Sequence, residues 1–224
     1  MSASREGTHN LRRGDSVLPA WVKEAVRATL RPVVGLAMAL HITPNTITVF
    51  GVVVTLLASV LVAGGWLLVG AAILTAGSLL DAVDGALARA QGGGTAFGSF
   101  LDSTLDRVGE AILYIGVAGW FLFAYEEPAW PVLLTLVALS GSFLVSYSRA
   151  RAEGIGLNAT VGLAPRTERL VLVIVGIAVA GLGYDLGLIG ALAIIAVLTM
   201  ATVMQRIWHV WRQSQAITLD SREN

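Results

Sequence analysis

The sequence predicts an all-α integral membrane protein in which six transmembrane helices follow an N-terminal amphipathic interfacial helix. Its 224 residues are 55% hydrophobic and 13% charged, with a mean hydropathy of +0.75. A soluble domain of this size carries about 25% charged residues. Several uncharged stretches approach or exceed the roughly 18–20 residues that a helix needs to cross a bilayer. Length and composition therefore predict one bundle of membrane helices rather than two domains.

The overall charge and the cysteine content argue against a nucleic-acid-binding protein and a thiol enzyme. The formal net charge is zero, so bulk electrostatics predict no nucleic-acid partner. The chain contains no cysteine, which excludes disulfides and thiol catalysis.

The N-terminal region divides into a polar tail and an amphipathic segment. Residues 1–17 lack the apolar core of a signal peptide, and we expect a disordered cytosolic tail there. In residues 18–40, apolar side chains recur at helical spacing and basic side chains take the other face. This pattern predicts a juxtamembrane helix that lies among membrane lipids. A helix packed against the rest of the protein fits the same pattern.

Glycine-rich and polar breaks divide the apolar region into spans within a transmembrane domain at 41–212. Gly64-Gly65, the run Gln91-Gly92-Gly93-Gly94 and a turn at Gly183 are such breaks. We expect a polar cytosolic tail at 213–224. The six predicted spans are 46–63, 66–89, 95–124, 130–147, 170–182 with flanking residues, and 186–203.

The positions of the basic residues predict the orientation of the bundle. With six spans, all 15 Lys and Arg residues fall on one side of the membrane or at the helix ends that face it. The opposite loops, at Gly64, Glu126 and Asp185, have none. The positive-inside rule places both termini and the basic side in the cytoplasm of a multi-pass cell-membrane protein.

Four aspartates stand out because ionisable groups within spans are costly and usually functional. Asp81 and Asp84 are three residues apart, and Asp102 and Asp106 are four apart, so each pair shares a helix face. A glycine loop between the two helices makes them antiparallel. All four carboxylates are therefore expected to converge near the cytoplasmic surface.

Clustered carboxylates repel one another unless cations neutralise them. Oxygen ligands of this kind suit Mg²⁺ or Mn²⁺, which neutralise the phosphates of a substrate. Structural ion pairs of the aspartates with Arg89 and Arg107 are one alternative. A cation transporter is another, although the carboxylates lie at one end of adjacent helices and the other spans have no matching acidic positions.

The spacing of these residues resembles the signature of the CDP-alcohol phosphotransferase family. The pattern is Asp81-x2-Asp84-Gly85-x2-Ala88-Arg89-x8-Gly98-x3-Asp102-x3-Asp106. The resemblance covers nearly the whole chain and implies an enzyme that cleaves the pyrophosphate of a CDP-linked lipid or alcohol. Such an enzyme joins the phosphoryl group to an acceptor hydroxyl and releases CMP.

The resemblance also implies roles for individual residues. Asp81, Asp84 and Asp102 resemble metal ligands for Mg²⁺ or Mn²⁺, with two ions, and Asp106 resembles the general base and a further metal contact. By itself, the segment before the first span is only a helix start, with Asn45 as a plausible cap. The resemblance makes the following residues contacts to the CDP-lipid: Thr43, Pro44, Asn45, Thr46, Gly85, Arg89 and Thr95.

Arginines after the fourth span point to a phosphorylated acceptor. Arg149, Arg151, Arg166 and Arg169 lie at two neighbouring helix ends, and arginine forks bind phosphate well. The positive-inside rule alone also explains them. Glu110 is expected to pair with Arg107 by helix spacing.

The stretches at 92–95, 106–107, 146–153 and 166–169 resemble bacterial phosphatidylinositol phosphate synthases and their archaeal counterparts. That resemblance implies CDP-diacylglycerol as donor, inositol 1-phosphate (1D-myo-inositol 3-phosphate) as the favoured phosphorylated polyol acceptor, and a homodimer. Glycerol 3-phosphate as acceptor, and a soluble inositol phosphodiester as product, stay open.

Overall fold

The described part of the chain is all-helical, as the sequence predicts. The computed structural model describes residue 32, residues 34–163 and residues 165–223, and the regular structure of these residues is entirely helical. The labelled helices are α2 (Pro44–Ala63), α3 (Leu67–Ala90), α4 (Ala96–Ala124), α5 (Ala129–Glu153), α6 (Arg166–Gly181) and α7 (Leu186–Glu223).

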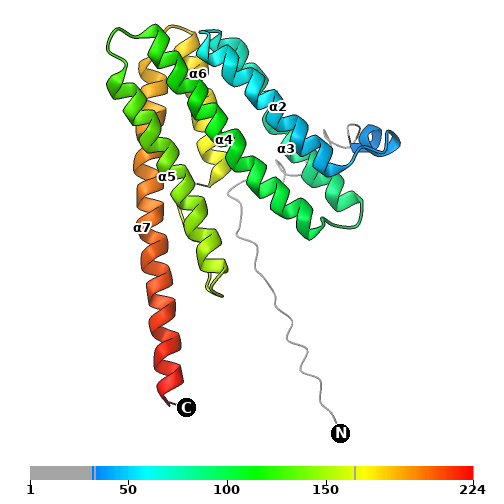
Figure 1. Cartoon of the computed structure of the whole chain (residues 1–224), viewed down its shortest axis with the longest axis vertical. Coiled ribbons are helices and arrows are strands. Elements are labelled where there is room, and N and C mark those ends of the chain that lie inside the picture. The colour runs from blue at the N-terminus through cyan, green and yellow to red at the C-terminus, as the bar shows by residue number, and fades with distance from the viewer. Residues whose placement is uncertain (1–31, 33, 164, 224) are drawn as a thin grey trace.

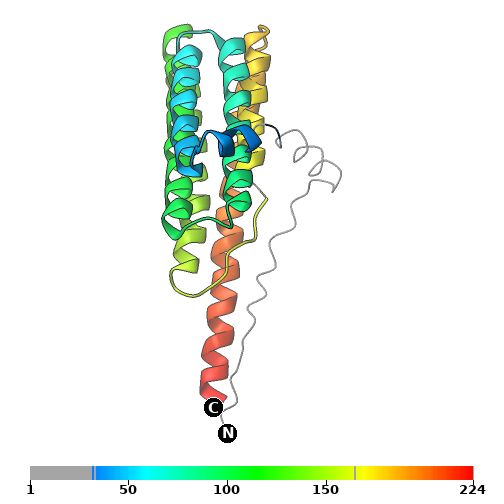
Figure 2. The same ribbon diagram turned by 90° about the vertical axis from the view of Figure 1, so that its right-hand side faces the viewer.

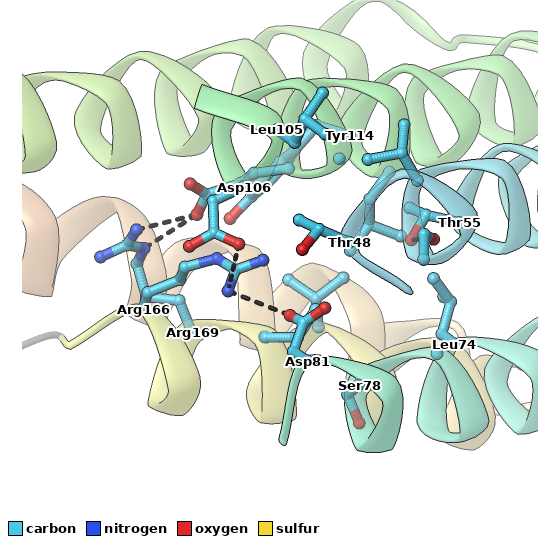
Figure 3. A pocket seen from close by; sticks show the side chains of 18 residues that line it. Thr48, Thr55, Leu74, Ser78, Asp81, Leu105, Asp106, Tyr114, Arg166 and Arg169 are labelled. Atoms are coloured by element: carbon cyan, nitrogen blue, oxygen red, sulfur yellow. Dashed lines mark hydrogen bonds and ion pairs between the residues drawn. The ribbon is translucent and has the colours of Figure 1, made fainter. Parts of the chain in front are cut away.

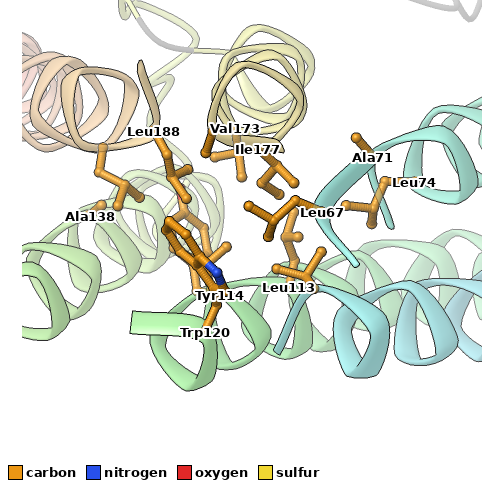
Figure 4. Packing of buried hydrophobic residues seen from close by; sticks show 14 of the residues in the cluster. Leu67, Ala71, Leu74, Leu113, Tyr114, Trp120, Ala138, Val173, Ile177 and Leu188 are labelled. Carbon is orange, nitrogen blue, oxygen red and sulfur yellow. The ribbon is translucent and has the colours of Figure 1, made fainter. Parts of the chain in front are cut away.

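The helices form a closed ring around one core. Helix α2 packs against α3 and α4, α4 against α5, α5 against α7, α7 against α6, and α6 against α3. Figure 1 shows α2, α3 and α4 inclined to α5 and α7, and both figures show α7 extending past its neighbours. The core contains buried side chains from all six helices, among them Leu113, Trp120, Ile177 and Leu188 (Figure 4).

Helices α2 and α4 approach unusually closely. A Cβ added at Gly116 would lie 2.6 Å from the backbone oxygen of Ser59, so only glycine fits there. Small residues of this kind let membrane helices pack backbone to backbone. The contact fixes α4, and the aspartates near its start, against α2.

Among the described residues, five helices are long and apolar enough to cross a membrane, namely α2, α3, α4, α5 and the 186–217 part of α7. The chain is therefore a multi-pass membrane protein. The fifth predicted span corresponds to α6, which has 16 residues and is about 24 Å long. That length is shorter than the roughly 30 Å hydrocarbon core.

Two helices extend beyond the predicted spans. Helix α5 continues to Glu153, and α7 runs for 38 residues to Glu223, into the segment that was expected as a polar tail. At 1.5 Å per residue, α7 is about 57 Å long, well beyond the thickness of a hydrocarbon core. The sequence prediction ended where the apolar run ends, whereas the helix continues into polar residues.

Most of the predicted amphipathic helix at 18–40, and the predicted tail at 1–17, lie outside the described residues. Residues 34–39 are helical, and Figure 2 shows this blue segment running across the bundle rather than along it. Ala37 belongs to a small apolar cluster with Ile47 of α2 and with Val83 and Leu87 of α3. The described end of the segment therefore packs on the bundle.

Candidate active site

A glycine turn brings two helices carrying aspartates together. Asp81 and Asp84 lie near the end of α3, and Asp102 and Asp106 lie near the start of α4. Between these helices Gly92 and Gly93 have φ angles of 95° and 113°, a conformation that favours glycine. The turn makes α3 and α4 antiparallel, and the four carboxylates gather at one end of the bundle.

Arg166, at the first position of α6, bridges two of the carboxylates. Its Nη1 lies 3.2 Å from Asp81 Oδ2 and 2.8 Å from Asp106 Oδ1. Figure 3 shows the guanidinium between the two acids, which come from different helices. Arg107 is more distant, with its Nη2 3.8 Å from Asp106 Oδ2. The bridging partner is therefore Arg166, and not Arg89 or Arg107, which the alternative of structural ion pairs named.

The other two aspartates differ in exposure. Asp84 is buried, and its Oδ2 accepts a hydrogen bond of 2.8 Å from the hydroxyl of Thr48 on α2. Asp102 is exposed on α4. Thr48 was missed in the sequence because only tertiary packing brings α2 beside α3. One carboxylate is thus fixed in the bundle and another faces the surface.

The donor chemistry of the cluster suits a divalent cation. The four carboxylates supply hard oxygen ligands, which Mg²⁺ and Mn²⁺ prefer. The cationic guanidinium between Asp81 and Asp106 marks a place where positive charge is stabilised. Within the described residues no group of three or more His, Cys, Asp or Glu side chains has metal-binding geometry. Asp81, Asp84, Asp102 and Asp106 are the residues that could hold a metal, and in the structure Arg166 contacts two of them.

A buried ion pair lies one helical turn beyond Asp106. Arg169 is 2% exposed, and its Nε and Nη2 donate to Glu110 Oε1 at 3.1 and 2.9 Å. The expected pairing of Glu110 with Arg107 is therefore wrong, because packing of α6 against α3 and α7 brings Arg169 into the bundle. The second oxygen of Glu110, Oε2, is buried without a hydrogen bond.

We expect Glu110→Ala to destabilise the protein by about 3–5 kcal/mol, because the substitution leaves the buried guanidinium without this counter-ion. Thermal unfolding in detergent measures the effect. The matched control is Glu153→Ala, which removes an exposed pair with Arg149 whose two side chains are each 54% exposed. That pair is worth at most about 1 kcal/mol. Equal shifts in Tm for the two variants would contradict the structural role of the Glu110 pair.

The predicted CDP-lipid contacts gather at the same end of the bundle. Thr43, not Asn45, caps α2, because its hydroxyl accepts from the backbone N–H of Thr46 and Pro44 occupies the first turn. Thr95 caps α4 by accepting from the N–H of Gly98 at 2.9 Å.

Side chains of the predicted CDP-lipid contacts lie close to two glycines, Gly98 and Gly85. A Cβ at Gly98 would lie 3.1 Å from Asn45 Oδ1, so the starts of α2 and α4 adjoin. A Cβ at Gly85 would lie 3.4 Å from Nη1 of Arg89. All seven predicted contacts therefore lie on α2, α3 or α4, or on their caps, near the four aspartates.

An arginine-lined cavity of about 770 Å³ adjoins the carboxylates. Arg166 and Arg169 line both this cavity and the smaller one that contains Asp81 and Asp106. Of the four arginines predicted to bind an acceptor, Arg151 is exposed and does not line the cavity. The arginines that line it are Arg107, Arg149, Arg166, Arg169 and Arg206.

Arg206 was missed in the sequence. It is 8% exposed on α7, and its Nε donates to the backbone oxygen of Val161 at 2.8 Å. Its Nη1 donates to the backbone oxygen of Val145. The sequence could have indicated Arg206, because an arginine inside a long apolar helix is costly and usually functional.

Carboxylates beside an arginine-lined cavity, at one end of a membrane bundle, suit an enzyme that acts on phosphate groups with a divalent cation. The family model for CDP-alcohol phosphatidyltransferase matches residues 41–212. The chain belongs to the CDP-alcohol phosphatidyltransferase family and is a metal-dependent transferase of phospholipid biosynthesis.

Relatives of this chain within the family include synthases of inositol phosphate lipids. An archaetidylinositol phosphate synthase of Methanothermobacter thermautotrophicus is 36% identical over 198 residues, which are 86% of this chain and 97% of the relative. A phosphatidylinositol phosphate synthase of Mycolicibacterium smegmatis is 37% identical over 188 residues, covering 82% and 84%.

Solved structures of phosphatidylinositol phosphate synthase from Mycobacterium tuberculosis have the same fold. The structure with bound CDP-DAG is 32% identical, has a TM-score of 0.76 and matches 81% of this chain and 93% of its own. The structure in complex with manganese and citrate has the same identity and TM-score and matches 81% and 88%.

Proposed function

We propose that the chain transfers the phosphatidyl group of CDP-diacylglycerol to a hydroxyl of inositol 1-phosphate, giving phosphatidylinositol phosphate and CMP. The observation that carries the proposal is the cavity lined by five arginines that shares Arg166 with the carboxylate cluster. Guanidinium groups bind phosphate through strong charge-assisted hydrogen bonds, so this cavity favours an acceptor that carries a phosphate. The names of the relatives favour the inositol phosphate among phosphorylated acceptors.

The carboxylates are proposed to hold the metal and to move the proton. Asp81, Asp84, Asp102 and Asp106 would hold Mg²⁺ or Mn²⁺, with two ions, in keeping with the manganese bound by the M. tuberculosis relative. The metal would neutralise the diphosphate of the CDP-lipid during transfer. Thr48 orients Asp84 through its hydrogen bond.

Asp106 is proposed as the general base. It takes the proton from the acceptor hydroxyl, and the acceptor oxygen then forms a bond to the phosphorus that carries the lipid. The bond from that phosphorus to the bridging oxygen breaks, and CMP leaves with the electron pair. Asp106 suits this role because Arg166, which lines the arginine cavity, contacts it at 2.8 Å.

Arg166 is proposed to change partners when the substrates bind. In the structure its guanidinium neutralises Asp81 and Asp106, and it also lines the acceptor cavity. A dianionic phosphate in the cavity competes for this guanidinium, since arginine forms strong charge-assisted pairs with phosphate. Movement toward the acceptor would free both aspartates. Thr43–Thr46, Gly85, Arg89 and Thr95 are proposed to contact the nucleotide of the donor.

We also propose six crossings, with both termini and the active site on the cytoplasmic side. An even number of spans, with the short α6 as the fifth, gathers the basic residues on one side, as the positive-inside rule requires. The donor lipid would reach the carboxylates sideways from the inner leaflet while its tails stay in the bilayer. A homodimer is proposed by resemblance alone.

An acceptor panel tests the proposal. Purified protein with CDP-diacylglycerol and Mg²⁺ is assayed for CMP release with inositol 1-phosphate, glycerol 3-phosphate, free inositol and serine. We expect release with inositol 1-phosphate at a kcat/KM well above that of the other three. A preference for glycerol 3-phosphate would keep the chemistry but replace the acceptor, and a preference for free inositol would overturn the role of the arginines.

A further inference from the structure

The loop between α5 and α6, described at residues 154–163 and 165, forms one wall of the arginine-lined cavity. Thr160, Gly162 and Pro165 line that cavity together with the arginines. Figure 2 shows the loop passing across α7 between the end of α5 and the start of α6. The position of this loop therefore determines the shape of the space in which the proposed acceptor binds.

The described part of the loop is closely bonded. The Leu157 N–H donates to the oxygen of Ala152 at 2.9 Å, and the Thr160 N–H donates to Asn158 Oδ1 at 2.8 Å. Ala159 is fully buried. These contacts shape the loop locally, but they do not fix it against the rest of the bundle.

Three side chains of α7 fix the loop to the bundle. Gln213 makes two hydrogen bonds with the backbone of Asn158: its Nε2 donates to the oxygen at 2.6 Å, and its Oε1 accepts from the N–H at 3.1 Å. Arg206 Nε donates to the oxygen of Val161. Thr202 Oγ1 accepts from the N–H of Leu163 at 3.0 Å.

The spacing of the three α7 residues is helical. Thr202, Arg206 and Gln213 are four and seven residues apart, which places them on one face of the helix. Gly162 packs against this face so tightly that a Cβ there would lie 2.5 Å from Cγ2 of Thr202. The loop therefore packs against, and hydrogen-bonds to, this polar face of α7 along most of its length.

The contacts with the loop extend beyond the apolar run of α7, as far as Gln213. Gln213 lies about 40 Å along the helix from Leu186, beyond a hydrocarbon core of about 30 Å. Figure 1 shows this part of α7 running past the end of α5. A helix that ended with its apolar run would carry Thr202 but not Gln213.

We infer that the extension of α7 is a clamp for the α5–α6 loop, and that Gln213 is a positioning residue for the phosphorylated acceptor. Gln213 does not line the cavity, so it acts through Asn158 and the loop. The inference rests on the proposed function only in naming the acceptor as the ligand of the cavity.

The test compares Gln213→Ala with Gln215→Ala, a matched control on the same helix whose side chain is exposed. Loss of two hydrogen bonds of ordinary strength is expected to raise the acceptor KM roughly tenfold, with the KM for CDP-diacylglycerol unchanged. Gln213→Glu keeps the acceptor for the Asn158 N–H and loses the donor, so an intermediate rise is expected. The assay uses whichever phosphorylated acceptor the wild type prefers.

Hydrogen exchange of the 154–165 segment provides a second readout that needs no turnover. Gln213→Ala is expected to speed exchange in this segment roughly tenfold, and Gln215→Ala is expected to leave it unchanged. Unchanged exchange in Gln213→Ala would overturn the clamp. Faster exchange with an unchanged acceptor KM, or with both KM values raised equally, would overturn the positioning role. Absence of wild-type turnover with inositol 1-phosphate would count against the proposed function alone.

Discussion

Asp106→Asn is expected to lower kcat by about 10³-fold while binding of CDP-diacylglycerol is largely retained. Asparagine keeps the shape of the side chain and an oxygen that Arg166 can contact, but it cannot accept the proton of the acceptor hydroxyl. Loss of general-base catalysis typically costs about 10²–10⁴-fold. Turnover is measured as CMP release, and donor binding is measured separately by titration with CDP-diacylglycerol.

Asp185→Asn is the matched control for this prediction. Asp185 lies in the turn between α6 and α7, where its Oδ2 accepts a hydrogen bond of 2.9 Å from the Tyr125 hydroxyl. This pair is at the other end of α4 from Asp106, so we expect the control to retain turnover. Loss of donor binding together with turnover in Asp106→Asn would count against the role of Asp106 as the general base.

Arg166→Ala is expected to raise the KM for the phosphorylated acceptor by about 10–100-fold and the KM for CDP-diacylglycerol much less. A hydrogen bond to a charged group contributes about 1.5–3 kcal/mol, which corresponds to this range. Arg166→Lys should give a smaller rise, because lysine keeps the charge but not the planar fork. Steady-state kinetics with each substrate varied in turn separate the two KM values.

Arg212→Ala is the control for the loss of a positive charge. Arg212 is exposed on α7, with its guanidinium 4.9 Å from the centre of the Trp208 ring, and it does not line the cavity. We expect both of its KM values to match the wild type. An equal rise of both KM values in Arg166→Ala would show that Arg166 serves the carboxylate cluster and not an acceptor phosphate.

The sequence predicted the features that depend on neighbouring residues. The helical class and the ends of α2, α3 and α4 followed from apolar runs and glycine breaks, to within a few residues. The four aspartates followed from helical spacing on either side of one turn. Local spacing is sufficient in these cases, because the residues concerned lie on two consecutive helices.

Features that depend on which helix faces pack together were missed or wrong. Glu110 pairs with Arg169 of α6 and not with Arg107, and Asp84 bonds to Thr48 of α2. Arg206 reaches the cavity only because α7 packs against α5 and α6. Helix α7 continues beyond the predicted span into polar residues, of which Gln213 bonds to the α5–α6 loop at Asn158, 55 residues earlier.

Identification of the lipid product tests the central claim most directly. Purified protein is incubated with CDP-diacylglycerol, inositol 1-phosphate and Mg²⁺, and the lipid and the released nucleotide are identified by mass spectrometry, with and without a chelator. The account predicts phosphatidylinositol phosphate and CMP in equal amounts, and neither product when the metal is removed. CMP without a new lipid, or a product whose headgroup lacks the acceptor phosphate, would contradict it.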